Sequence, residues 1–140
     1  MKKYLNAAFA YAILAMAGGV FHREFTKYNG FTGETTLAVV HTHYFLLGMV
    51  TFLLFVLLEK EFSFTDAKTP RIVLVYHIGL NLTAIMLWVR GVTEVLGTEM
   101  TTAADAAISG IAGLGHILMG VSLVMLLLRA KRRVCASEAR

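Results

Sequence analysis

The chain has few charged residues, one proline and one cysteine. Of its 140 residues, 16% are charged and 57% are hydrophobic, whereas about a quarter of the residues in soluble domains are charged. This balance excludes an ordinary soluble domain and predicts a membrane protein. The single cysteine, Cys135, excludes a disulfide framework and a cysteine-based zinc site within one chain. The single proline, Pro70, favours long unbroken helices.

Four uncharged segments make up most of the chain. Each is long enough to cross a hydrocarbon core of about 30 Å as a helix. We therefore expect one all-α integral membrane domain over residues 1–140, with four transmembrane helices in an up-down arrangement and no room for a soluble catalytic domain. The expected spans cover about residues 4–25, 35–58, 70–96 and 103–129.

The basic residues lie where the expected helices leave the membrane, and they form no stripe that would bind nucleic acid. Most of them are on the side that holds both termini. On the opposite side, acidic residues offset the basic ones. The positive-inside rule therefore places the N and C termini in the cytoplasm. The basic residues on the terminal side are Lys2, Lys3, Lys60, Lys68, Arg71, Arg129, Lys131, Arg132 and Arg133.

All five histidines lie in the expected spans or at their ends. Ionisable side chains at membrane depth are costly unless they pair with another group or bind a ligand. A single intramembrane histidine is commonly a hydrogen-bonded core residue, but five of them, with every span represented, favour ligation of iron, copper or zinc. We expect structural roles for His22 and His77, with Asn81 orienting the imidazole of His77 from one turn away. The five are His22, His41, His43, His77 and His116.

His41 and His43 are separated by one residue. On an unbroken helix they point about 200° apart, so they cannot bind the same ion. In a lone four-helix bundle one of them would face lipid, which is costly. The spacing therefore predicts protein or cofactor on both sides of this helix, as in an oligomer. The alternative is that one imidazole only bonds a backbone carbonyl of an adjacent helix.

The fourth span is rich in glycine around His116. Gly113 and Gly120 lie on the same helix face as His116. Small residues there favour close helix packing, or alternatively leave clearance for the edge of a porphyrin. The other two glycines are Gly110 and Gly115.

Arg90 and Glu94 are spaced as an i, i+4 ion pair near the outer boundary of the third span. Such a pair is usually a satisfied feature of a helix end. The alternative is that Arg90 holds a haem propionate, because a guanidinium binds carboxylates well.

The segment 41–49, with the sequence HTHYFLLGM, resembles the tenth helix of the catalytic subunit of haem-copper oxidases, in which a His-x-His-Tyr stretch opens a similar apolar run. In that family the two histidines point in opposite directions, toward two different haems. The oxidase subunit has twelve helices in three arcs of four, so the resemblance implies that this chain corresponds to one arc. Three copies would then rebuild the oxidase architecture as a homotrimer, with His41 of one protomer and His43 of its neighbour ligating a b-type haem between them.

The chain as a whole is also similar to an uncharacterised family of small bacterial four-span membrane proteins. This similarity implies a multi-pass protein of the bacterial cytoplasmic (inner) membrane, but it indicates no particular activity. The His-Pro-Glu-Val-Tyr and His-His stretches of the oxidases are absent, so oxygen reduction is not expected. An acidic residue at the centre of a span, which would relay protons, is absent too.

The sequence therefore predicts a membrane protein that binds haem b for electron transfer or for binding a diatomic gas. His41 and His43 are the expected ligands, and His116 is a distal or alternative ligand. One alternative is a copper or zinc carrier or chaperone, which would add a methionine ligand. Another is an accessory subunit without a cofactor, whose histidines bond neighbouring helices. The pattern leaves catalytic turnover and the redox partner open. The candidate methionines are Met49, Met100 and Met119.

Overall fold

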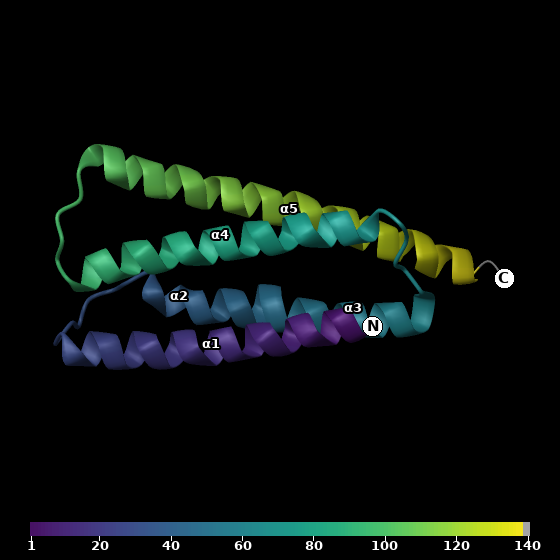
Figure 1. Cartoon of the computed structure of the whole chain (residues 1–140), viewed down its shortest axis with the longest axis horizontal. Helices are drawn as coiled ribbons and strands as arrows, with labels where there is room; N and C mark the ends of the chain where they lie inside the picture. The colour runs from purple at the N-terminus through teal and green to yellow at the C-terminus, as the bar shows by residue number, and fades with distance from the viewer. Residues whose placement is uncertain (139–140) are drawn as a thin grey trace.

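The computed structural model describes residues 1–138, and all of its secondary structure is helical (Figure 1). The second span consists of three helical segments in succession. Each of the four helical rods is long and apolar enough to cross a membrane, which confirms the predicted fold class of four transmembrane helices. The elements are α1 (Lys2–Tyr28), α2 (Leu37–Thr42), the π-helical segment η1 (His43–Val50), α3 (Thr51–Phe62), α4 (Thr69–Val95) and α5 (Thr102–Glu138).

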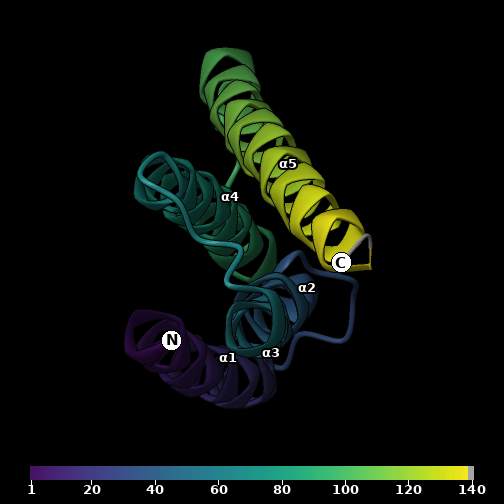
Figure 2. The same ribbon diagram turned by 90° about the vertical axis from the view of Figure 1, so that its right-hand side faces the viewer.

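The chain runs up and down, so that its N-terminus and the C-terminal end of α5 lie on one side of the molecule (Figure 1). We call this the terminal side, and the opposite side, with the loops 29–36 and 96–101, the far side. The second span packs against α1, and α2 and η1 contact α4. Helix α5 packs along α4 and contacts α3. In the end-on view, α1 and α5 lie at opposite extremes of the assembly (Figure 2).

The core on the terminal side is aromatic. Tyr4, Phe52, Phe55 and Phe64 are at most 2% exposed. Tyr4 stacks on Phe64 with ring centroids 5.9 Å apart, and Phe52 meets Phe55 edge to face at 5.6 Å. Large apolar side chains also cover the outside, among them Phe9 at 69% exposure, which suits a surface that lipid surrounds.

The segment η1 departs from the unbroken α-helix that the sequence predicted. The Tyr76 hydroxyl donates to the Leu47 carbonyl at 2.6 Å, and the Thr51 hydroxyl donates to the Leu46 carbonyl at 2.9 Å. Both hydroxyl groups thus donate to backbone carbonyls of the π-helical segment η1. Gly48 is required here, because a Cβ atom would lie 2.6 Å from Cγ of Tyr11. Segments of this kind are frequent at functional sites, and η1 begins at His43.

Helix α4 begins at Thr69, with Pro70 in its first turn. The N-cap residue is Lys68, whose side chain forms no capping hydrogen bond, and the nearby Asp66 satisfies the first backbone N–H groups instead. The Asp66 carboxylate accepts hydrogen bonds from the backbone N–H groups of Lys68 at 2.8 Å and Thr69 at 2.9 Å. It also pairs with Arg129 of α5.

We expect the stabilising effect of Asp66 to depend on pH. Partial desolvation raises the pKa of this carboxyl, but the hydrogen bonds from Thr69 and Lys68, together with Arg129, outweigh it and lower the pKa from 3.8 to about 2. Because the folded-state pKa lies below the unfolded one, the stabilisation is present above about pH 4 and is lost as the pH falls through about 2. Asp66→Asn should therefore lower the thermal midpoint in detergent at pH 7, and the difference from wild type should vanish near pH 2.

Glu99→Gln, in the loop on the far side, is the control for removing one acidic charge. If Asp66→Asn lowered the thermal midpoint by the same amount at both pH values, the charge of the carboxylate would not be what stabilises this turn.

Candidate cofactor site

His43 and His116 come together from two different spans. Their ring centroids are 5.9 Å apart and their planes are inclined by 82°. His43 is the first residue of η1, and His116 is in the middle of α5. The structure thus pairs His43 with the residue that the sequence offered as an alternative ligand.

Both imidazoles are held in the same way by their own helices. Nδ1 of His43 lies 2.8 Å from the Val39 carbonyl oxygen, and Nδ1 of His116 lies 2.9 Å from that of Ala112. A carbonyl oxygen only accepts, so each Nδ1 carries the proton and each neutral ring keeps a lone pair on Nε2. Metal-bound histidines commonly donate their other ring N–H to a carbonyl in this manner. In this tautomer Nε2 is the nitrogen of each ring that could bind a metal.

His41 points to the other side of its helix, toward α1. A Cβ atom added at Gly19 would lie 3.7 Å from the His41 Cβ, so the ring lies against this glycine. Its Nδ1 is buried and has no hydrogen-bond partner in the described part of the chain. The prediction that His41 and His43 face different neighbours is confirmed. Both neighbours, α1 and α5, belong to the same chain, so opposed imidazoles do not by themselves require an oligomer.

The glycines of α5 divide into two groups. A Cβ atom at Gly115 would lie 2.5 Å from Oγ1 of Thr83 on α4, so Gly115 serves close helix packing. At Gly113 and Gly120 an added Cβ would meet no atom within 4 Å. Gly113 and the exposed His116 thus lie beside open space in the protomer. Close packing of α5 against α4 is a reason for a glycine at position 115. No contact within the chain gives such a reason for the glycine at position 113.

His43 lines a hollow of about 210 Å³ together with Thr42, Leu46 and Leu47. Small-molecule sites typically measure about 300–1,000 Å³. The donor atoms for a metal are present, but the hollow in one chain is too small to enclose a macrocycle. A second surface would have to complete the wall.

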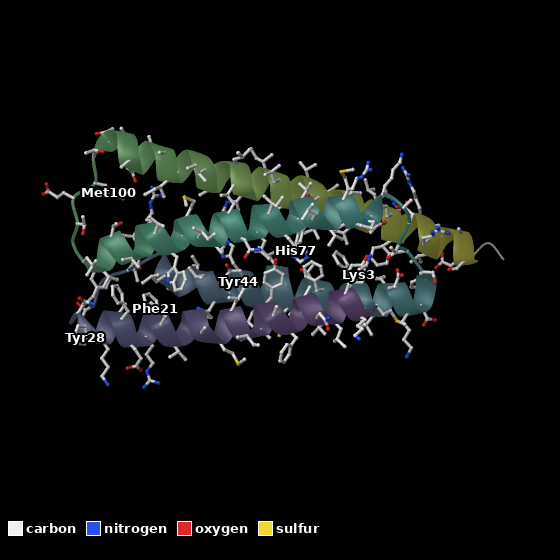
Figure 3. All side chains as sticks on the ribbon, in the orientation of Figure 1. Lys3, Phe21, Tyr28, Tyr44, His77 and Met100 are labelled. Carbon is white, nitrogen blue, oxygen red and sulfur yellow. The ribbon has the colours of Figure 1, made fainter. Side chains whose placement is uncertain are left out.

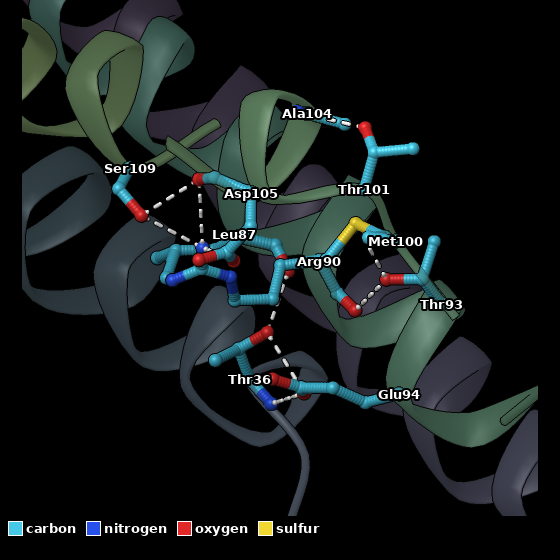
Figure 4. Close-up of polar contacts among 10 residues, drawn as sticks. All are labelled: Thr36, Leu87, Arg90, Thr93, Glu94, Met100, Thr101, Ala104, Asp105 and Ser109. Atoms are coloured by element: carbon cyan, nitrogen blue, oxygen red, sulfur yellow. Dashed lines mark hydrogen bonds and ion pairs between the residues drawn. The ribbon is translucent and has the colours of Figure 1, made fainter. Parts of the chain in front are cut away.

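Arg90 connects α4 to α5 at the far side (Figure 4). Its Nη2 donates to the Asp105 carboxylate at 2.5 Å and to the Ser109 hydroxyl at 2.8 Å. Glu94 instead accepts from the backbone N–H of Thr36 at 2.7 Å. The predicted Arg90–Glu94 pair is therefore wrong, because each side chain finds its partner on a neighbouring segment. Binding of a haem propionate by Arg90 stays a prediction. The Asp105 carboxylate would compete with a propionate for the guanidinium.

His77 belongs to a separate polar network inside the bundle, between α1, the second span and α4 (Figure 3). The Tyr11 hydroxyl donates to Nδ1 of His77 at 2.6 Å and accepts from Nδ2 of Asn81 at 3.0 Å. The Tyr44 hydroxyl donates to Oδ1 of Asn81 at 3.3 Å. The imidazole also stacks on Phe52, at 4.7 Å between centroids. Tyr11, which nothing in the sequence pointed to, therefore orients the imidazole. Asn81 was predicted to do so, but among the described residues its bond to His77 is to the backbone carbonyl and not to the ring.

We expect Tyr11→Phe to destabilise the bundle by roughly 1–2 kcal/mol, because it leaves polar atoms of His77 and Asn81 without their partner in an apolar interior. Thermal unfolding of the purified protein in detergent measures this change. Tyr28→Phe removes a hydroxyl from a side chain that is 91% exposed and should have no effect. A Tyr11→Phe protein as stable as wild type would show that the network contributes nothing to folding.

Residues 1–133 match the family described as a protein of unknown function, DUF2871. The chain belongs to the DUF2871 family. Neither a curated protein nor a solved structure is significantly similar to it. The expectation of an uncharacterised family of four-span proteins is thereby confirmed, and membership in DUF2871 brings no activity with it.

Proposed function

We propose that the protein binds haem b in the membrane through His43 and His116, for electron transfer or for binding a diatomic gas. The observation that carries the proposal is the paired imidazoles, with Nδ1 of each held by a carbonyl and Nε2 of each left to ligate. The ring centroids of His43 and His116 lie 5.9 Å apart, close enough for both side chains to contact one bound group.

The number of donors favours haem over a zinc carrier. Haem iron takes one or two protein ligands, whereas protein zinc sites use three or four. In residues 1–138 no three His, Cys, Asp or Glu side chains are grouped so that they could hold one metal ion. Two histidines are the set that a haem needs.

The side chains around the pair determine what the site can do. His43 and His116 would hold the iron, and Leu46 and Leu47 keep the surroundings apolar. The open space at Gly113 gives room beside His116. Bound haem would supply one-electron chemistry, and the low polarity around the two histidines would tune its potential. A diatomic gas would bind the iron only after displacing one of the two imidazoles.

A neighbouring copy of the chain would complete the site. The hollow at His43 is incomplete within one chain, and α5 presents an open face at Gly113 and Gly120. A homotrimer is the assembly that the resemblance to the oxidase arc implies. In such an assembly His41 of the adjacent protomer stays the alternative ligand that the resemblance implies, in place of His116, although its Nδ1 is buried in its own chain.

The optical spectrum of the protein, purified in detergent from cells supplied with haem precursor, tests this function. We expect a Soret band and visible bands that shift when dithionite reduces the iron. Absence of Soret absorbance after haem has been supplied would overturn the proposal. Elemental analysis with stoichiometric copper or zinc and no iron would instead establish the carrier function.

A further inference from the structure

A groove of about 290 Å³ lies between α4 and α5, on the terminal side of a close contact between these helices. That contact is at Gly79, where an added Cβ atom would lie 2.5 Å from the backbone nitrogen of Met119. The walls of the groove are apolar, and they include Ile72 and Val75 of α4 and Ile117, Val121 and Met125 of α5.

Two polar side chains line this groove, and only one of them is available to a ligand. The Ser122 hydroxyl donates to the Leu118 carbonyl at 2.5 Å. Arg71, in the first turn of α4, is exposed and forms no ion pair with the described residues. Arg90 and Arg129, by contrast, are paired with Asp105 and Asp66. The groove thus combines an uncompensated guanidinium at its end with apolar walls that extend toward the middle of the membrane.

We propose that the groove binds one acyl chain of an anionic phospholipid, with the phosphate held by Arg71. A guanidinium binds phosphate oxygens through two parallel hydrogen bonds. Basic pockets between transmembrane helices on the cytoplasmic side are suited to anionic headgroups, and the positive-inside rule predicts that Arg71 is on that side. The site is separate from His43 and His116, and it does not depend on the proposed haem.

Native mass spectrometry of the full chain, with equal amounts of dioleoyl phosphatidylglycerol and dioleoyl phosphatidylcholine, tests the proposal. The two lipids share their acyl chains and differ in headgroup charge. We expect wild type to retain one phosphatidylglycerol in preference. Arg71→Gln removes the hydrogen bonds to the phosphate, so it should weaken that binding about tenfold or more, as expected for hydrogen bonds to a charged group, and should remove the preference. Lys60→Gln, which removes the same charge from the end of α3, should leave the preference intact.

A second variant tests the apolar part of the groove. Val121→Phe adds bulk to the wall, and because Val121 is 56% exposed the change should not unfold the protein. It should weaken retention of phosphatidylglycerol while Arg71 is still present. Equal losses in Arg71→Gln and Lys60→Gln would overturn the proposal in favour of diffuse charge attraction. Unchanged binding in Val121→Phe, or displacement of phosphatidylglycerol by inorganic phosphate alone, would overturn it in favour of a surface anion site.

Discussion

Replacing either His43 or His116 by alanine is expected to abolish the haem absorbance of the purified protein. Loss of a group that merely orients a metal-bound histidine typically costs about 10–100-fold in affinity, so loss of the ligand itself should cost more. The protein should still fold, because His116 is exposed and His43 is only partly buried. Haem content relative to protein, measured from the Soret band and protein absorbance, checks this expectation in each variant.

Two further histidine variants make the result specific. His22→Ala, at the far end of α1, should keep its haem and serves as the matched control. His41→Ala distinguishes the two candidate pairs. If His41→Ala loses haem while His116→Ala retains it, then the His41–His43 pair predicted from the sequence is correct, and the pair seen within the chain is not the site.

The second large effect is expected at Gly79, where α4 and α5 touch. An added Cβ atom would lie 2.5 Å from the Met119 nitrogen and 2.8 Å from the Gly115 oxygen. Both are backbone atoms, so Gly79→Ala must push the helices apart, and overpacking of this kind costs about 1–3 kcal/mol or more. We expect a markedly lower thermal midpoint in detergent and a poor yield of folded protein.

Gly113→Ala is the matched control, because its Cβ would meet no atom within 4 Å. Alanine also forms helix more readily than glycine, so this variant should be at least as stable as wild type. Gly113→Leu should fold as well, but its longer side chain would occupy the space beside His116 and lower the haem content. If Gly113→Ala were as damaging as Gly79→Ala, the open face of α5 would have to be tightly packed in the native protein.

The four spans were predictable because each depends on a long uncharged run, and the cost of polar groups in lipid leaves few alternatives. The opposed directions of His41 and His43 were also predictable, because they follow from helix geometry over two residues. Which helix each one faces was not. That depends on the order of the four rods in space, which places α1 on one side of the second span and α5 on the other.

Interactions between helices account for the errors. Arg90 was assigned to Glu94 by a rule that considers a single helix, whereas its partner, Asp105, is in the first turn of the next helix. The π-helical segment at His43 depends on hydroxyl donors such as Tyr76, which lies in another span. Tyr11 contacts His77 from the first span, and nothing in the sequence near either residue indicates that the two are in contact. A single sequence without spatial neighbours does not specify these contacts.

Electron paramagnetic resonance of the oxidised protein, labelled with ¹⁵N-histidine, tests ligation by His43 and His116 most directly. The account predicts hyperfine coupling from two imidazole nitrogens to low-spin iron in wild type. It predicts that this two-nitrogen signal disappears in both His43→Ala and His116→Ala. An iron signal without imidazole coupling, or one that keeps two coupled nitrogens in both variants, would contradict it.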